Sequence, residues 1–383
     1  MKIAVFTDTF LPQVNGVVTN VIDLIKELSK KNHQLLVFAP KPSKKISFIL
    51  KGVKIDHIGG LPAVFYPEFY FTNPISFQIL KTTEKFNPDI IHFHTPITIG
   101  FNAIITAKYL KKPLVSTFNT YFMEPEYLRV VGLDRFGLDK NRFINRFSWQ
   151  FARFFYDQSD IIITPSQFTK DDLIKHGFIK PVIKISNGIN LPKKLKKPIK
   201  NHFGQYFLYV GRLSKEKNIS LLITSFKKFS LFDQKTKLLI IGEGPEKNDL
   251  KKLVINFHLN NRVLFLGSIT HDTLMESNYY SNALAFISAS TSETQGLSIL
   301  EACSFKLPII AVKARAVTEL FNNNGILCQP NNIGELADAL KVMTSNENLR
   351  SKFSYQSLEI AKKHSLNTTI KELENIYMSL IKK

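Results

Sequence analysis

The strongest constraint on the fold is a regular alternation of short apolar segments with longer amphipathic segments. The short segments are rich in β-branched residues and apolar throughout, which is typical of strands buried on both faces of a parallel sheet. In the first half they lie at residues 2–7, 34–39, 89–94, 113–118, 160–164 and 182–186. In the second half they lie at residues 206–210, 237–241, 262–266, 284–288, 308–312 and 326–328. Helix-length segments such as 18–30 and 298–304 separate them, so the pattern predicts an α/β chain with two doubly wound, Rossmann-like parallel sheets.

A change of composition near the middle of the chain predicts where the two domains meet. Residues 191–200 read LPKKLKKPIK, which suits a solvated linker better than a core strand or a stable helix. We therefore expect an N-terminal domain over 1–195 and a C-terminal domain over 201–365. Because open α/β sheets bind ligands at the carboxyl ends of their strands, we expect both domains to face a central cleft.

The end of the chain, residues 366–383, has the spacing of one amphipathic helix, which we expect to pack back on the N-terminal domain. Its predicted apolar face carries Ile370, Leu373, Ile376, Tyr377 and Leu380.

The composition excludes several classes of protein. Only two cysteines, Cys303 and Cys328, are present, which argues against a disulfide scaffold and a multi-cysteine zinc site. No apolar segment approaches the ~20 residues of a membrane span. The opening MKIAVFTDTF lacks the layout of a signal peptide, so we expect a location on the cytosolic side.

The charge predicts an anionic partner. The chain has 51 Lys and Arg against 31 Asp and Glu, a net charge of +20. Residues 1–200 carry +14 of this excess and residues 201–383 carry +6. Nucleic acid, an anionic membrane face and a phosphorylated substrate would each suit such a charge, and a Lys-rich codon bias is an alternative cause of part of it. No recognisable nucleic-acid-binding module is present, so we expect no nucleic-acid partner.

The loop after the first predicted strand excludes two common nucleotide sites. It contains one glycine, Gly16, instead of the three of a dinucleotide-binding loop, and the chain has no Walker A sequence. A glycine before a helix N-terminus lets an anion approach the backbone N–H groups, and a simple turn is the alternative interpretation of Gly16.

Three motifs of the second half follow predicted strands. Gly211-Arg212-Leu-Ser-Lys215-Glu-Lys217 brings a guanidinium and an ammonium to a strand end, where they suit phosphate oxygens. Gly242-Glu-Gly244-Pro245 is best interpreted as a tight turn. The third motif has two carboxylates separated by seven residues.

In that third motif, Glu293 and Glu301 flank a helix predicted to start near Gly296 or Leu297. The N–H groups of Gly296, Leu297 and Ser298 would face an anion, and the carboxylates suit ribose and sugar hydroxyls. Together the three motifs suit a sugar nucleotide, whereas surface glutamates alone do not explain their joint spacing.

These residues carry a resemblance to a known family. GRLSKEKN followed by SETQGLSILEA resembles the retaining GT-B glycosyltransferases of family 4, and the likeness extends over nearly the whole chain. NGVVT, HFHTP and STFNTYFMEPEYL look most similar to the bacterial 1,2-diacylglycerol 3-glycosyltransferases, the monoglycosyldiacylglycerol synthases.

The resemblance implies a role for each motif residue. Gly16 would lie against the donor phosphates or the acceptor. Gly211 opens the loop in which Arg212 and Lys217 would bind the diphosphate. The remaining contacts to the nucleotide sugar would come from Glu293 (transferred sugar), Gly296, Leu297 and Ser298 (backbone contacts) and Glu301 (ribose).

One position departs from the family pattern. Relatives commonly carry His where this chain has Asn119, and an amide cannot take a proton as an imidazole can. We expect Asn119 to take part in catalysis by hydrogen bonding, with His92 and His94 of HFHTP as alternative imidazoles or as structural residues. Retention can proceed with the departing diphosphate accepting the proton, aided by Arg212 and Lys217. We expect no cofactor and no protein-bound metal, with Mg²⁺ at most stimulating without protein ligands.

A basic and aromatic stretch over residues 121–158 predicts contact with a membrane. Basic residues interleaved with bulky aromatics are typical of interfacial elements. We interpret residues 147–156 as core, with a lipid-facing aromatic surface as the alternative, and residues 129–146 as membrane-facing. The predicted membrane-binding residues are Arg129, Arg135, Lys140, Arg142 and Arg146.

The sequence thus predicts a peripheral enzyme at the cytoplasmic face of the membrane, moving glucose or galactose from a UDP-sugar to the 3-hydroxyl of 1,2-diacylglycerol. Another acceptor, such as phosphatidylinositol or a polysaccharide, and a non-catalytic basic binding protein are the alternatives.

Overall fold

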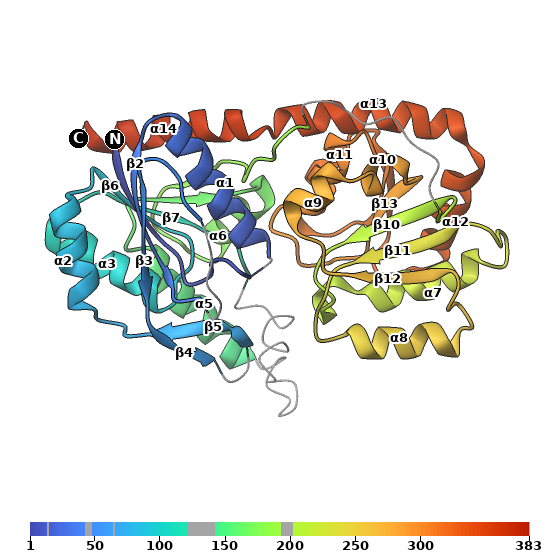
Figure 1. The fold of residues 1–383 in the computed structure, drawn as a ribbon, viewed down its shortest axis with the longest axis horizontal. Coiled ribbons are helices and arrows are strands. Elements are labelled where there is room, and N and C mark those ends of the chain that lie inside the picture. The colour runs from blue at the N-terminus through green and yellow to red at the C-terminus, as the bar shows by residue number, and fades with distance from the viewer. Residues whose placement is uncertain (14, 43–47, 64–65, 122–141, 193–201, 383) are drawn as a thin grey trace. The chain divides into compact units, whose positions relative to one another are not determined.

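The chain folds into two units of similar construction, each built on one parallel sheet (Figure 1). A computed structural model describes residues 1–13, 15–42, 48–63, 66–121, 142–192 and 202–382. The N-terminal unit comprises Met1–Gly188 together with Leu366–Lys383, and the C-terminal unit comprises Ile189–Ser365. Most of the predicted linker 191–200 lies outside the described residues.

The sheet of the N-terminal unit has seven strands, and every neighbouring pair runs parallel. In spatial order they are β3 (Val53–Ile58), β2 (Gln34–Pro40), β1 (Lys2–Phe6), β6 (Ile90–Phe93), β7 (Leu114–Thr117), β8 (Ile161–Thr164) and β9 (Val182–Lys184).

Helices cover both faces of this sheet because successive strand residues point to opposite sides. Ile3 and Val5 of β1 join the core under α1 (Gly16–Lys30) and α14 (Leu366–Ile381). Ala4 and Phe6 join the core on the opposite face. That face is covered by α2 (Phe77–Phe86), α3 (Thr98–Leu110), α5 (Arg142–Tyr156) and α6 (Gln167–Lys175).

The last helix packs on the N-terminal unit through its predicted apolar face. Ile370, Leu373 and Tyr377 of α14 are buried, and Ile376 and Leu380 are partly buried against the same core. The predicted helix over 366–383 is therefore confirmed in its apolar face.

The C-terminal unit repeats this plan with six parallel strands. Their spatial order is β12 (Val263–Gly267), β11 (Lys237–Ile241), β10 (Tyr206–Val210), β13 (Ala285–Ser288), β14 (Ile309–Val312) and β15 (Gly325–Cys328). One face packs against α7 (Ile219–Phe229), α8 (Lys247–Asn256) and α12 (Ile333–Ser345). The other packs against α9 (His271–Glu276), α10 (Tyr279–Asn282), α11 (Leu297–Ser304) and α13 (Glu347–Lys363).

The predicted strands are all present within a residue or two of their expected ends, and the structure adds three. The edge strand β3 reads VKIDHI, so its polar residues hide it from a search for fully apolar segments. β4 (Gly60–Ala63) and β5 (Tyr66–Thr72) form a separate antiparallel pair that carries Gly and Pro.

Asp8 fixes the start of α3 from the loop that follows β1. Its buried carboxylate accepts hydrogen bonds from the backbone N–H groups of Ile99 (2.6 Å), Ile97 and Gly100 (both 3.2 Å) and from the Thr95 hydroxyl (2.9 Å). A carboxylate is the group that the positive end of a helix favours. The first backbone N–H groups of α3 therefore already have an acceptor in Asp8.

Candidate active site

Loops from three neighbouring strands meet at the carboxyl edge of the C-terminal sheet. β10 lies between β11 and β13, and all three run parallel, so the loops that follow them emerge side by side. These loops carry the Gly211–Lys217, Gly242–Pro245 and Glu293–Gly296 motifs. The topology therefore brings together the residues that the sequence predicted to act jointly.

Lys217 and Glu293 join the loop after β10 to the loop after β13. Lys217 ends the short 3₁₀ helix η2 (Lys215–Lys217), and its Nζ lies 2.6 Å from Glu293 Oε1. Burial alone would raise the pKa of Glu293, but the Lys217 ammonium outweighs it and holds that pKa below the ordinary value. Burial likewise disfavours the charged Lys217, and Glu293 reverses this and raises the pKa of Lys217. Both side chains are thus held charged.

Glycines let the loops after β10 and β11 approach each other closely. A Cβ at Gly242 would lie 1.9 Å from the Gly211 carbonyl oxygen, and one at Gly244 would lie 2.3 Å from that of Leu213. Leu213 N–H donates to the Glu243 carbonyl (2.9 Å). A turn closes one step later than the motif predicted, over residues 244–247, where Lys247 N–H donates to the Gly244 carbonyl (3.2 Å). The two glycines let this loop support the backbone that carries Arg212.

Arg212 follows Gly211 and is held by its main chain. The buried Tyr209 donates its hydroxyl to the Arg212 carbonyl at 3.0 Å. Burial lowers the pKa of the Arg212 guanidinium, with Glu216 opposing this effect. The residue is half-buried at the same strand end as Lys217.

The helix predicted near Gly296 or Leu297 begins at Leu297. Gly296 precedes α11 with φ 94°, a left-handed conformation that favours glycine. The N–H groups of Gly296, Leu297 and Ser298 belong to the cap and first turn, where an α-helix provides no internal partners. They follow Glu293 by three to five residues, at the end of the loop that leads from β13 into α11.

Glu301 is oriented by two side chains that the sequence interpretation did not identify. Its Oε1 lies 3.0 Å from His271 Nε2, and its Oε2 accepts the Tyr280 hydroxyl at 3.2 Å. Tyr280 is fully buried, and Glu301 is about one turn into α11, as expected. His271 and Tyr280 come from α9 and α10, more than twenty residues away, so no local pattern pointed to them.

The carboxyl edge of the N-terminal sheet holds the other predicted residues. Gly16 is the first residue of α1 rather than a residue before it, and Asn15 caps the helix by accepting from Val18 N–H (3.0 Å). Asn119 is buried just beyond β7.

The two histidines of HFHTP differ in their surroundings. His92 Nδ1 lies 2.6 Å from the Tyr377 hydroxyl, and His92 Nε2 lies 2.7 Å from Thr117 Oγ1, so both ring nitrogens are used inside the fold. His94 stacks on His92 with ring centroids 4.2 Å apart. His92 therefore has a structural role, which is one of the two alternatives that the sequence left open for these histidines.

Family models match both units of this chain. One, described as "Glycosyltransferase Family 4", covers residues 14–193, and "Glycosyl transferases group 1" covers residues 192–359. The chain is 30% identical to the alpha-monoglucosyldiacylglycerol synthase of Streptococcus pneumoniae, over 81% of this chain and 71% of that protein. The chain belongs to the family 4 glycosyltransferases of the GT-B fold.

Two further similarities extend over the full length of this family 4 glycosyltransferase. The alpha-monoglucosyldiacylglycerol synthase of Acholeplasma laidlawii is 26% identical over 100% of this chain and 98% of that protein. The structure of Anabaena HepE in complex with UDP-glucose has a TM-score of 0.75 at 19% identity, and covers 99% of this chain and 100% of HepE. The latter supports the two-unit GT-B fold.

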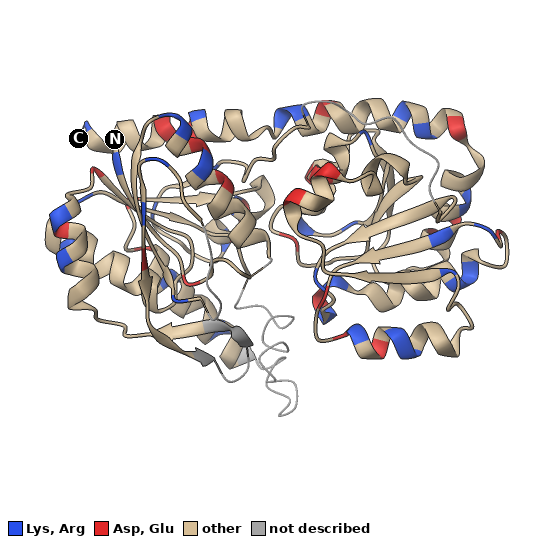
Figure 2. Cartoon of the chain, in the orientation of Figure 1, with Lys and Arg blue, Asp and Glu red and all other residues tan. Residues whose placement is uncertain are grey.

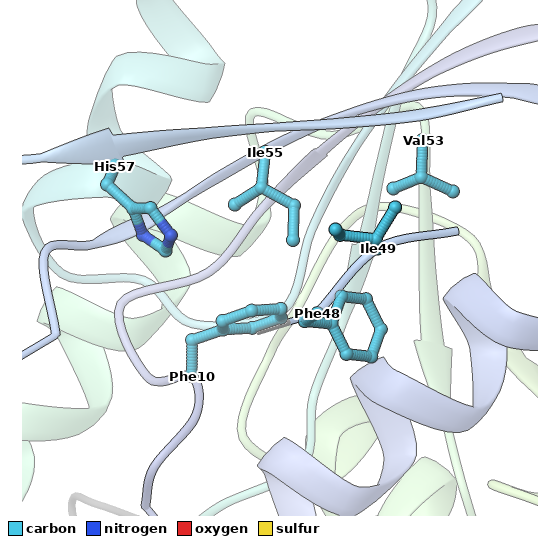
Figure 3. Close-up of a pocket in the computed structure, with 6 residues that line it drawn as sticks. All are labelled: Phe10, Phe48, Ile49, Val53, Ile55 and His57. Atoms are coloured by element: carbon cyan, nitrogen blue, oxygen red, sulfur yellow. The ribbon is translucent and has the colours of Figure 1, made fainter. Parts of the chain in front are cut away.

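A pocket of about 220 Å³ lies beside the edge strand β3 of the glycosyltransferase's N-terminal unit. The rings of Phe10 and Phe48 lie opposite the β3 side chains (Figure 3). The pocket is lined by Phe10, Phe48, Ile49, Val53, Ile55 and His57. Most of these side chains are apolar, but most of the surface exposed inside the pocket is polar, so the lining does not favour a hydrocarbon over a polar group.

Helix α5 of the glycosyltransferase has one buried and one exposed aromatic face. Trp149, Phe155 and Tyr156 are buried, which confirms the core interpretation for these residues. The same interpretation is wrong for Phe147, Phe151 and Phe154, which are 67%, 43% and 60% exposed. With Phe143, 84% exposed, they recur at helical spacing and form the exposed stripe of α5.

The predicted cationic membrane residues are only partly described. Arg146 is exposed on α5, and Arg142 is the first residue of that helix, whereas Arg129, Arg135 and Lys140 lie outside the described residues. Figure 2 shows Lys and Arg spread over helices of both units.

No helix in the described ranges combines the length and apolarity that a membrane span requires. Nor do those ranges contain three or more His, Cys, Asp or Glu grouped to bind a metal ion.

Proposed function

We propose that this family 4 glycosyltransferase moves a hexose, glucose or galactose, from a UDP-sugar to the 3-hydroxyl of 1,2-diacylglycerol. The product is a monoglycosyl diacylglycerol, and the anomeric configuration of the sugar is retained. The observation that carries the donor half is the partly buried Lys217–Glu293 pair, in loops that also carry Arg212 and lead into α11. The acceptor half is supported by the two relatives named as alpha-monoglucosyldiacylglycerol synthases.

The proposed reaction develops negative charge on the leaving group. The bond between the anomeric carbon and the diphosphate oxygen breaks, and a bond to the glycerol oxygen forms on the same face of the sugar. The hydroxyl proton passes to the departing diphosphate. Arg212, Lys217 and the first N–H groups of α11 would stabilise that charge, which is electrostatic preorganisation.

The carboxylates have a different task in this proposal. Glu293, held ionised by Lys217, accepts a hydrogen bond from a hydroxyl of the transferred sugar. Glu301, fixed by His271 and Tyr280, accepts from the ribose hydroxyls. Asn119 donates or accepts a hydrogen bond near the sugar and takes no proton. Any Mg²⁺ would pair with the donor diphosphate and not with protein side chains.

The exposed stripe of α5 supports a peripheral position at a membrane, which we propose is the cytoplasmic face. An exposed aromatic face with Arg146 on the same helix suits the boundary between headgroups and acyl chains of an anionic membrane. An acceptor such as phosphatidylinositol or a polysaccharide is the alternative within the family.

The test is to incubate the chain with labelled UDP-glucose or UDP-galactose and vesicles that contain diacylglycerol, and then to separate the lipids. We expect one labelled glycolipid, and we expect Glu293→Gln to lower its formation on the order of 100-fold. Labelled product only with phosphatidylinositol vesicles would establish the alternative acceptor. An unchanged rate in Glu293→Gln would remove Glu293 from the site.

A further inference from the structure

His94 is a buried imidazole without a hydrogen-bond partner among the residues that the structure describes. Only 2% of His94 is exposed, and neither Nδ1 nor Nε2 has a partner in those ranges. A buried polar group without a partner costs free energy, so such groups call for an explanation. Substrate hydroxyls would supply the missing partner.

The position of His94 is that of a ligand-binding residue. It directly follows β6, at the carboxyl edge of the N-terminal sheet, where α/β folds bind their ligands. The parallel register pairs Val5 with His92 and His92 with Val115, so His94 lies level with Thr7 and Thr117 on its two neighbouring strands. This is also the edge at which the loop after β1 leads into α1.

The hydrogen bonds of His92 distinguish it from His94. The two rings stack, but His92 uses both nitrogens for Tyr377 and Thr117. Burial lowers the pKa of His94 to about 3, so its ring is neutral and offers one N–H donor and one lone pair. A neutral imidazole of this kind suits an uncharged hydroxyl and does not suit a phosphate.

We infer that His94 binds the reacting hydroxyl of the acceptor and holds it in position for transfer. The inference rests on the proposed function, in which the N-terminal unit receives diacylglycerol. His94 is then a positioning residue that supplies an imidazole where Asn119 has none, and the two residues follow the neighbouring strands β6 and β7.

The first experiment compares His94→Phe with His92→Phe in the full chain. Because His94 makes no described hydrogen bond, a phenyl ring should leave Tm unchanged or raise it, whereas His92→Phe should lower Tm. We expect His94→Phe to lower kcat/KM for 1,2-dioctanoylglycerol about 10- to 100-fold. Hydrolysis of the UDP-sugar without acceptor should remain at the wild-type rate. A structural role would instead lower Tm and both activities together, which would overturn the inference.

The second experiment observes the ring directly in the wild-type chain. The chain has nine histidines, and selective ¹⁵N-histidine labelling with His94→Phe identifies the His94 nitrogens. Adding 1,2-dioctanoylglycerol should shift a His94 nitrogen and leave those of His92 in place. A shift caused by UDP-sugar alone, or none with acceptor, would overturn the inference.

Failure of the proposed function gives a different result. A wild-type chain that makes no glycolipid would overturn the diacylglycerol acceptor and this inference together. A wild-type chain that makes it, alongside an equally active His94→Phe, would overturn the inference alone.

Discussion

The Lys217 ammonium lies 2.6 Å from the Glu293 carboxylate, although 76 residues separate them in the sequence. The pair connects the loops after β10 and β13, and it holds both groups charged in a largely buried position. The pair therefore keeps an ammonium ready for a diphosphate and a carboxylate ready for sugar hydroxyls, while each charge balances the other.

Removing one partner of this pair should cost more stability than removing both. Lys217→Met leaves the partly buried Glu293 carboxylate without its cation, and we expect a loss of about 1–3 kcal/mol in the free energy of unfolding. In the double variant Lys217→Met/Glu293→Gln, no charge is left unpaired, so part of this loss should return. Denaturant unfolding of the wild type and the three variants measures the coupling. Strict additivity would show that the pair contributes nothing.

The same pair predicts a pH dependence of stability. The pKa of Glu293 is lower in the folded state than its ordinary value of 4.5, so the folded chain binds fewer protons there than the unfolded chain. Its contribution is fully present above about pH 4.5 and is lost as the pH falls through the folded pKa. Tm measured from pH 7 to pH 3 should therefore fall less steeply for Glu293→Gln than for the wild type. Parallel curves would contradict the assigned direction.

Tyr280 should affect donor binding without contacting the donor. Tyr280→Phe removes the hydroxyl that orients Glu301, and we expect KM for the nucleotide sugar to rise about 5- to 20-fold. Tyr206→Phe is the matched control, because the Tyr206 hydroxyl donates to the Tyr279 carbonyl (2.7 Å) and not to a site residue. Initial rates at varied donor concentration distinguish the two. An equal effect in both variants would indicate a general loss of packing in this unit.

The hydrogen bond between His92 and Tyr377 should contribute to the attachment of the last helix. Tyr377→Phe leaves a buried imidazole nitrogen without its partner and should cost about 1–3 kcal/mol. His92→Phe loses the same bond, so the double variant should lose less than the two single losses added together. Guanidinium unfolding measures all four proteins. Independent effects would mean that the hydrogen bond contributes little.

The exposed stripe of α5 should determine binding to anionic vesicles. Phe147→Ser removes an aromatic side chain worth about 1.5–3 kcal/mol when buried, so cosedimentation should weaken about 10-fold or more. Phe232→Ser, at an exposed position of the C-terminal unit, is the control and should bind as the wild type does. Equal binding by both variants would direct the search for the membrane contact to another surface.

The sequence was informative wherever the signal was local. Fully apolar segments identified the central strands, and the spacing of Ile370, Leu373 and Tyr377 predicted the buried face of α14. The edge strand β3 was not predicted because only one of its sides pairs within the sheet, and its sequence VKIDHI mixes polar with apolar residues. The aromatic residues of α5 could not be divided into core and surface from composition, because both faces of that helix are aromatic.

The sequence by itself determined the two α/β units, the order of their strands along the chain and the motifs that follow those strands. Local periodicity and glycine positions record such features within a few neighbouring residues. Only the tertiary structure decided that Lys217 pairs with Glu293 and that His271 and Tyr280 orient Glu301. It also decided that both ring nitrogens of His92 are hydrogen-bonded, whereas those of His94 have no partner among the described residues. Those relationships join residues 21 to 285 positions apart, and the packing of strands and helices, not any local pattern, brings such residues together.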